Sequence, residues 1–482
     1  MKKIRPVVPV SLAMSLGALC VGALSLGVVV VSCWSFSAPE DAAGTGDDTS
    51  AESLRERSGS PGSAGSAGTE VATPALPSGS SNNSEGNAPP LALGATGSAG
   101  ASGSSEVAAP PLPLGAAGTP GSTGTPGSAG STGAPPVVAS TPCDILAAAG
   151  NPCVAAHSTT RVVFGGYTGP LYQVCRGATA PGPNSCPGGM TRDIGSVAGG
   201  SADSAAQDAF CAGGSCSISI IYDQSPNDND LRPAPAGGAK PTPDNPAVAT
   251  DLKTTLNGNA VYGVFIKTGM GYRAGCTGCG TPVPKGTAVA DEPETMYMVT
   301  SPNGLVNGCC FDYGNGETDS RDDGNGTMEA LYFGGGVVWG TGSPGGHNNG
   351  PWVMADLENG LYAGWENNQD QGITTNTPIR VPFVMGVVVG DTRDKNGGRG
   401  RFAIYGGDAT FGALKTLYDG IRPAKPGYVP MQKQGSIILG IGGDNSASGA
   451  GQWFEGVMAS GAATVETVNA LQANIVAAGY GK

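Results

Sequence analysis

Short runs of β-branched, aromatic and alternating residues recur from about residue 140 onward, and Gly- and Asn-containing turns separate them. Such runs are typical of strands, because successive side chains of a strand face opposite sides of a sheet. Turn signals lie at Asn257-Gly258, Asn303-Gly304 and Asn396-Gly397. The pattern predicts an all-β fold in which two sheets pack as a β-sandwich. The predicted strands are 217–222, 260–267, 296–300, 328–333, 379–389, 401–405 and 436–441.

One helix is predicted, and it lies close to the C-terminus. Apolar residues recur there at helical spacing, and Thr464 is a suitable N-cap. We therefore expect a sandwich with a single C-terminal helix. The apolar positions are Val465, Val468, Leu471, Ile475 and Val476.

Residues 350–360 have the pattern of one strand that begins after a Gly-Pro turn and ends at Asn-Gly. Trp352, Met354, Asp356 and Glu358 would then share one face, with the two carboxylates about 6–7 Å apart. Acidic residues are disfavoured inside strands. Two of them beside a tryptophan therefore indicate a concave site, and a solvated edge strand is the alternative.

The N-terminus has the layout of an export signal, with three basic residues before an apolar run over 7–31. The run is also long enough to span a bilayer. The four residues that end at Cys33 resemble a bacterial lipobox, and Cys20 offers a poorer match. A lipid anchor at Cys33, an uncleaved helix and release with an incidental cysteine all stay open. We assign residues 1–36 to this signal or anchor and expect membrane contact only through it.

Residues 37–140 are rich in Gly, Ser, Ala, Thr and Pro and almost lack aromatic residues. Such a segment cannot bury enough apolar surface to offset the entropy of ordering, so it predicts a flexible tether. Glycine recurs at every third position over 115–133, but a collagen helix needs more triplets and more proline. Residues 141–482 are left for the β-sandwich domain of an exported, extracellular or surface-attached protein.

Composition narrows the classes of partner. The formal net charge is −13 without a basic cluster, which argues against nucleic acid. His157 and His347 are the chain's two histidines, so a His-rich metal site and several Ser-His-Asp candidates are excluded. We expect a monomer with no metal or organic cofactor, and a neutral glycan is compatible with the acidic surface.

The cysteines indicate disulfides. Of the 12 in the chain, ten lie beyond Cys20 and Cys33, and an even set in an exported chain is typical of disulfide pairing. The one Cys-x-x-Cys motif lacks two further ligands for zinc. Cys309 and Cys310 are left to pair with each other or stay free, and strain of a vicinal disulfide would suit a functional site. The local pairs are Cys143–Cys153, Cys175–Cys186, Cys211–Cys216 and Cys276–Cys279.

A second acidic candidate lies in residues 437–446, where an apolar strand and two glycines precede Asp444. Glycine lets a ligand approach the backbone, and a plain Asp-Asn turn is the alternative. Asp312, Glu329 and Glu455 are rival carboxylates. Two carboxylates from different strands fit glycoside hydrolysis. A sandwich lectin without catalysis is the rival class of protein.

Several blocks of the chain together carry a family resemblance. Taken in order, they resemble the α-L-arabinofuranosidase B family, glycoside hydrolase family 54, from about residue 142 to 480. The resemblance implies a jelly-roll-like, concanavalin-type sandwich. It also implies a retaining, exo-acting arabinofuranosidase that acts on arabinose-containing plant polysaccharides. The blocks are 142–145, 153–161, 206–211, 221–225, 309–315, 350–359 and 439–446.

The resemblance also implies roles for individual residues. Glu358 would be the nucleophile and Asp444 the general acid/base. Cys309–Cys310 would be a vicinal disulfide against the arabinose ring, and Asp356 would accept a sugar hydroxyl. Cys143–Cys153 and Cys211–Cys216 match bridges of the family, whereas Cys175, Cys186, Cys276 and Cys279 are additions. The residues expected to line the sugar site are Cys309, Cys310, Trp339, Asp356, Asn359 and Gly443.

The chain departs from the family pattern in three places. Pro226 and Asp230 stand where Gly and His are common, and Gly360 stands where a second Asn often follows. The family's C-terminal β-trefoil arabinose-binding domain is expected to be missing after residue 482. Polymer binding would then depend on the active site alone.

Overall fold

The computed structural model describes residues 20–25, 28–33, 140–279, 281–335, 350–364, 376–391, 400–422 and 427–482. The chain divides into an N-terminal unit, Met1–Ser122, and a second unit, Thr123–Lys482. Of the predicted tether, only residue 140 is described.

In the N-terminal unit, β1 (Cys20–Ser25) and β2 (Val28–Cys33) pair antiparallel, with Cys20 opposite Cys33. The described parts of the apolar run are thus extended, in contrast to the uncleaved-helix alternative. No helix within the described ranges has the length and apolar character needed to cross a membrane.

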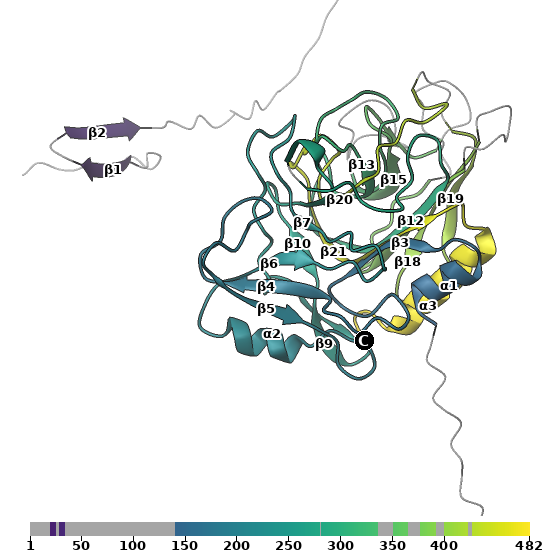
Figure 1. Cartoon of the computed structure of the whole chain (residues 1–482), viewed down its shortest axis with the longest axis horizontal. Helices are drawn as coiled ribbons and strands as arrows, with labels where there is room; N and C mark the ends of the chain where they lie inside the picture. Colours follow the sequence, from purple (N-terminus) through teal and green to yellow (C-terminus); the bar gives the residue numbers. More distant parts are fainter. Residues whose placement is uncertain are drawn as a thin grey trace, which may run out of the picture. The chain divides into compact units, whose positions relative to one another are not determined.

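Two seven-stranded antiparallel sheets pack face to face in the second unit (Figure 1). The predicted all-β sandwich is therefore confirmed, while its jelly-roll connectivity stays a prediction. The first sheet is, in spatial order, β10 (Val264–Ile266), β21 (Ala450–Ser460), β12 (Glu294–Val306), β17 (Val384–Asp391), β18 (Arg401–Asp408) and β19 (Lys415–Gly420), with β3 (Cys153–Ser158) paired to β21. The second is β16 (Leu361–Tyr362), β15 (Trp352–Asp356), β14 (Glu329–Gly334), β13 (Asp312–Gly316), β20 (Ser436–Leu439), β11 (Tyr272–Ala274) and β7 (Arg232–Pro233).

The period-two pattern of β15 explains how the second sheet is oriented. Val353 and Ala355 belong to the main core between the sheets. Trp352 and Met354 belong to a separate cluster with Tyr332. The alternate side chains thus face the outer side of the sheet, as the strand pattern predicted, but β15 is paired on both sides and is not an edge strand.

Most predicted strands are present, with shifted ends. Residues 260–267 divide at Gly263 into β9 (Asn259–Tyr262) and β10, and Asn303-Gly304 lies inside the long strand β12 instead of ending it. The register of β12 against β21 shifts there, so the turn signal became an irregularity within a strand. Asn257-Gly258 does form a turn, and Asn396-Gly397 lies outside the described residues. The remaining strands are β4 (Tyr172–Arg176), β5 (Met190–Ile194), β6 (Cys216–Ile221) and β8 (Lys253–Leu256).

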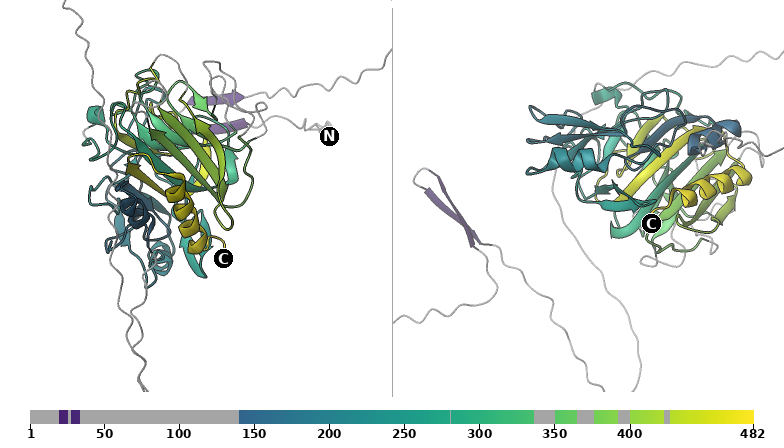
Figure 2. Two further views of the ribbon diagram at one scale, coloured as in Figure 1. Left: turned by 90° about the vertical axis from the view of Figure 1, so that its right-hand side faces the viewer. Right: turned by 90° about the horizontal axis from the view of Figure 1, so that it is seen from below.

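The C-terminal helix is confirmed as α3 (Val465–Ala478), which begins at its Thr464 N-cap and ends at Gly479 with φ 74°. Val468, Leu471 and Ile475 are fully buried. Figure 2 shows the helix alongside the sheets, and it contacts β17 and helix α1 (Pro142–Ala148).

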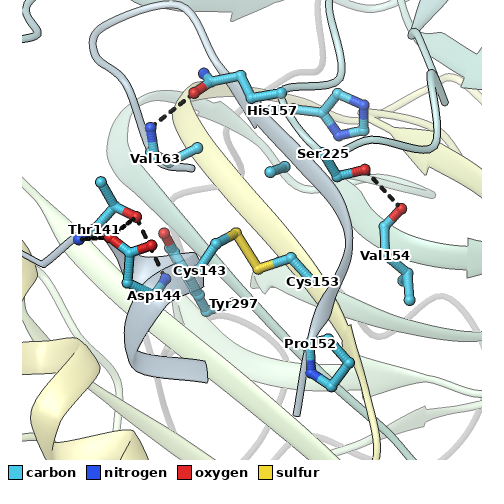
Figure 3. Close-up of a disulfide and its surroundings, with 12 residues drawn as sticks. Thr141, Cys143, Asp144, Pro152, Cys153, Val154, His157, Val163, Ser225 and Tyr297 are labelled. Atoms are coloured by element: carbon cyan, nitrogen blue, oxygen red, sulfur yellow. Dashed lines mark hydrogen bonds between the residues drawn. A yellow bond between two sulfur atoms is a disulfide. The ribbon is translucent and has the colours of Figure 1, made fainter. Parts of the chain in front are cut away.

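Two short helices, α1 and α2 (Ser204–Cys211), and the 3₁₀ turn η1 (Thr277–Cys279) were not predicted. They are too short to show a helical repeat, so local contacts define them. In α1, Thr141 and Asp144 form a capping box, with a 2.8 Å hydrogen bond from the Thr141 N–H to Asp144 Oδ2. Figure 3 shows this box beside the Cys143–Cys153 disulfide, which joins α1 to β3.

Candidate active site

Strands of the second sheet deliver five carboxylates to one region. Asp356 ends β15 and Asp312 begins β13, while the other three follow strand ends. All are buried except Asp444, which is partly exposed. A cluster of this kind in one region is unfavourable unless protons are shared, so it indicates chemistry and not packing. The five residues are Asp312, Glu317, Asp356, Glu358 and Asp444.

Glu358 lies in a tight turn and not in the strand. The expectation of one strand through residue 360 is therefore wrong beyond Asp356. Glu358 and Asn359 have φ values of 60° and 56°, a left-handed conformation that costs a non-glycine residue free energy. Hydrogen bonds hold the turn: the Glu358 N–H donates to Asp356 Oδ1 (3.1 Å), and the Tyr428 hydroxyl donates to the Glu358 carbonyl (2.7 Å).

The turn after β20 presents Asp444, as the sequence predicted. The Ser446 N–H donates to Asp444 Oδ1 at 2.9 Å, which fixes the carboxylate against its own loop. A Cβ atom on Gly443 would overlap the Glu317 carboxylate, so a larger residue there would have to displace one of these two acids. The Gly443 carbonyl accepts a hydrogen bond from Arg273, which lies in β11 between strands β20 and β7.

Arg273 connects the two loops. It is 3% exposed, and its guanidinium donates to the main-chain carbonyls of Glu317, Gly442 and Gly443. Burial lowers the pKa of Arg273 to about 10, while the charges of Glu317 and Asp444 act in the opposite direction. Arg273 therefore stays charged at neutral pH and counters part of the acidic charge. Neither a periodic pattern nor a motif in the sequence singles out this residue.

Cys309 and Cys310 form a disulfide immediately before β13, and the other four disulfides join the pairs expected from the sequence. The vicinal pair packs with Tyr332, Trp352 and Met354. The Ser446 hydroxyl lies 2.9 Å from Cys309 Sγ, so the disulfide is linked to the Asp444 loop. Both sulfurs and Asp356 are close enough to hold an ion, but the disulfide leaves no thiolate to bind one.

Electrostatics divide the buried acids into two interacting pairs. Burial raises the pKa of Asp312 well above its ordinary value, together with the charge of Asp356 and a hydrogen bond to it. Burial, with the charges of Glu317 and Asp356, raises the pKa of Glu358 to about 11. The second pair is Glu317 with Glu358, and burial raises the pKa of Glu317 to about 7. Each pair retains a proton at neutral pH because two buried neighbouring carboxylates cannot both ionise.

Two rival carboxylates have structural partners. Glu455 accepts hydrogen bonds from Arg161 at 2.6 and 2.8 Å and from the Tyr297 and Tyr480 hydroxyls. Glu329 accepts from Lys433 at 2.9 Å. Their charges are thus neutralised away from the five-acid cluster. The third rival, Asp312, does lie in that cluster.

Other expected site residues have distinct placements. Asn359 is exposed, and its amide donates to Asp322 Oδ1 at 3.0 Å. Trp339 and His347 lie outside the described residues. At Gly360, a Cβ atom would lie 2.8 Å from the Tyr362 hydroxyl, so the second Asn of the family pattern would crowd this position. Glu317, Arg273 and Ser446 were missed. No motif singles out Glu317 or Arg273, and Ser446 ends the predicted block 437–446 without an assigned role.

A cavity of about 320 Å³ with both polar and apolar lining lies at the β7–β11 edge of the second sheet, and neither Glu358 nor Asp444 lines it. Asp230, one of the family departures, lines this cavity, and burial raises its pKa to about 6. Asp230 Oδ1 accepts from the Asp223 N–H at 3.1 Å. That departure therefore changes a loop beside the cavity and not the acid cluster.

Residues 142–481 resemble known proteins in sequence. A sequence model of the family described as "Alpha-L-arabinofuranosidase B, catalytic" matches residues 142–481. The arabinofuranosidase/B-xylosidase of Trichoderma koningii is 49% identical over 348 residues, which are 71% of this chain and 64% of that protein. The probable α-L-arabinofuranosidase B of Aspergillus terreus is 48% identical over 348 residues, 71% of this chain and 63% of that protein.

Two solved structures resemble this chain in sequence and in fold. A crystal structure of an arabinofuranosidase complexed with arabinofuranosyl-α-1,2-xylobiose is 44% identical, with a TM-score of 0.62 over 70% of this chain and 65% of that chain. A family 54 α-L-arabinofuranosidase soaked with a cyclic sulfate inhibitor is also 44% identical, with a TM-score of 0.61 over 70% of this chain and 66% of that one. The chain spans less than two thirds of the length of the two fungal relatives. By sequence and by fold, this chain belongs to the α-L-arabinofuranosidase B family, glycoside hydrolase family 54, and residues 142–481 are its catalytic region.

Proposed function

We propose that this chain is a retaining, exo-acting α-L-arabinofuranosidase that releases L-arabinose from arabinose-containing plant polysaccharides. The observation that carries the proposal is the proximity of Glu358 and Asp444, whose charge acts on Glu358, at the ends of two strands of a family 54 domain. The names of the relatives and the arabinofuranosyl ligand of one solved neighbour support the same substrate class.

Glu358 is the nucleophile of the proposed reaction, and Asp444 is the general acid/base. Protonated Asp444 gives its proton to the departing glycosidic oxygen while a Glu358 carboxylate oxygen bonds to the anomeric carbon. Water then gives a proton to Asp444 and attacks that carbon, which releases arabinose and frees Glu358. The partial exposure of Asp444 suits this role, because the acid must meet both the leaving group and water.

The Cys309–Cys310 disulfide offers an apolar surface to one face of the sugar ring. Asp356, at 3.3 Å from Cys310 Sγ, is placed to hold a ring hydroxyl beside it. Asn359, Gly443 and Trp339 complete the proposed sugar site. The chain's own carboxylates supply the acid, base and nucleophile, so the reaction requires no metal or organic cofactor.

Export is part of the proposal. The basic start and apolar run have the layout of a signal, and five disulfides are typical of an oxidising compartment. We propose that residues 37–140 tether a monomeric enzyme to its point of attachment, with Cys33 as the lipidated residue. Labelling cells with a radioactive fatty acid tests the anchor: the parent chain should be labelled and Cys33→Ser should not.

The activity is tested with an aryl α-L-arabinofuranoside and a panel of other aryl glycosides. We expect rapid release of the aryl group from the arabinofuranoside alone, and NMR should show the retained anomer first. A matched Glu358→Ala preparation controls for contaminating hydrolases. First release of the inverted anomer would overturn the mechanism. Binding of arabinosides without any hydrolysis would instead favour a lectin.

A further inference from the structure

Glu317 is a buried acid beside the proposed nucleophile. It follows β13 directly and is 0% exposed, whereas Glu358 is 6% exposed. The Thr327 hydroxyl donates to Glu317 Oε1 at 2.6 Å. Across the described part of the chain, Oε2 has no hydrogen-bond donor of the ordinary kind. This buried oxygen is thus available to accept a proton.

Two hydrogen bonds place Glu317 beside the turn of Glu358. The Gly326 N–H donates to the Leu357 carbonyl at 2.8 Å, and the next residue, Thr327, donates to Glu317. Gly443 leaves space for Oε2, since a Cβ atom there would overlap it. Arg273 donates to the main-chain carbonyls of Glu317 and Gly443 and so fixes the relative positions of both loops. Burial raises the pKa of both acids, while the contact with Glu358 lowers the pKa of Glu317 and the Glu317 charge raises that of Glu358. Two carboxyls can share a hydrogen bond only when one of them carries a proton.

Burial favours the neutral form of both acids, and their neighbours then decide which of them holds the proton in the free enzyme. Thr327 and Arg273 favour the ionised form of Glu317. Glu358 faces the charges of Glu317, Asp356, Asp322 and Asp444, all of which favour its neutral form. A neutral Glu358 cannot attack the anomeric carbon, because the nucleophile of this reaction is the ionised carboxylate. The nucleophile therefore needs a nearby base.

We propose that Glu317 is a positioning residue of the reaction, whose Oε2 takes the proton of Glu358 and keeps it while Glu358 attacks. This inference depends on the proposed glycosidase function. The Glu358 O–H bond breaks and a Glu317 O–H bond forms, so Glu358 becomes an anion as positive charge develops on the anomeric carbon. The Asp444 proton goes separately to the leaving group. When water releases the sugar, the shared proton returns to its first position.

The test compares Glu317→Gln and Glu317→Met with the parent enzyme in the pH dependence of kcat/KM. Gln keeps a hydrogen-bond donor for an ionised Glu358 and removes a neighbouring negative charge. We expect the acid limb to move at least one pH unit lower while the maximal rate stays within about tenfold. Met offers neither donor nor acceptor, and we expect a loss of at least 100-fold in kcat.

Glu294→Gln is the matched control. Glu294 is 2% exposed, and burial raises its pKa to about 7, but it pairs with Lys433 at 2.9 Å in a different cluster. Its variant should keep the parent pH profile. A parent profile in Glu317→Gln, or full turnover in Glu317→Met, would overturn the inference.

Carboxyl ¹³C NMR gives a readout that does not depend on turnover. In the parent enzyme labelled at glutamate, two carboxyl signals should titrate together, and Glu317→Gln should remove one and move the other to lower pH. Independent titration of the two signals would also overturn the inference. Absence of arabinofuranosidase activity in the parent enzyme would count against the proposed function. The NMR titration would still test whether Glu317 and Glu358 share a proton.

Discussion

The Sγ atom of Cys310 lies 3.3 Å from Oδ2 of Asp356, a residue 46 positions further along the chain. A disulfide sulfur carries no hydrogen, so this contact is a hydrogen bond only when Asp356 carries the proton. Burial raises the pKa of Asp356 to about 8, which keeps that proton in place at neutral pH. The disulfide and the acid cluster are therefore one unit of structure.

The first prediction follows from this unit. A disulfide between adjacent residues closes a minimal loop, whereas Cys143–Cys153 closes one with a sequence separation of 10. Replacing Cys309 and Cys310 by Ala should lower the free energy of unfolding only by about the contribution of the side-chain packing that is removed. The same change should raise KM at least tenfold. Replacing Cys143 and Cys153 should cost about 3 kcal/mol and leave KM unchanged. Thermal unfolding and initial rates check both, and the reverse pattern would contradict the assignment.

The second prediction separates the roles of the two proposed catalytic acids. Glu358→Gln should abolish turnover of every substrate. Asp444→Asn should spare substrates with good leaving groups far more than poor ones, because good leaving groups need little acid assistance. Added azide should restore turnover to Glu358→Ala and yield an arabinosyl azide, detected by mass spectrometry. If Asp312 variants behaved this way instead, the assignment of Glu358 would be wrong.

The third prediction concerns Gly443. A Cβ atom at this position overlaps the Glu317 carboxylate, so Gly443→Ala must displace either Glu317 or the Asp444 loop. We expect kcat to fall at least 100-fold with a modest loss of stability. Gly195→Ala is the matched control, since nothing lies within 4 Å of a Cβ atom there. Parent-like rates for Gly443→Ala would show that the two loops tolerate displacement.

The fourth prediction is a stability that falls as pH rises. Burial raises the pKa of Asp356 to about 8 and that of Asp312 further, so the folded state holds protons that the unfolded chain releases near pH 4. As pH rises from about 4 to 8, the free energy of unfolding falls by about 1.4 kcal/mol per pH unit for each proton that the folded state retains. Urea unfolding at pH 5, 6, 7 and 8 measures the slope.

Asp312→Asn should flatten that slope, because an amide replaces the titrating group and still donates to Asp356. The matched control is Asp419→Asn, at an exposed residue that pairs with Arg401 at 2.7 Å. Its slope should equal that of the parent chain. A parent slope that rises with pH would contradict the shared proton of Asp312 and Asp356.

The fifth prediction tests the rival acid Glu455. Its side chain is fully buried with Arg161, Tyr297 and Tyr480 around it. Glu455→Ala leaves the Arg161 charge unpaired and should cost about 3 kcal/mol of folding free energy, with kcat of the folded fraction unchanged. Urea unfolding and active-site titration measure the two effects. Loss of kcat without loss of stability would make Glu455 part of the chemistry.

The sequence by itself determined the architecture and the family. Period-two runs predicted the sandwich, since side-chain alternation is a local property of strands, and the spacing of Val468, Leu471 and Ile475 predicted the C-terminal helix. The blocks around Glu358 and Asp444 indicated the family that comparison confirmed. Local cysteine spacing was also enough, because short loops bring their ends together with little entropy loss.

Only the tertiary structure decided how the acid cluster is built. Strand alternation placed Asp356 on the correct face but also extended β15 through Glu358, because a left-handed turn held by Tyr428, a residue 70 positions away, leaves no local signal. Glu317 and Arg273 have ordinary neighbours in the sequence and acquire their roles only when β11, β13 and β20 lie side by side. Shared protons and raised pKa values arise from burial and from charges brought together by the fold, and neither quantity is encoded in the spacing of residues along the chain.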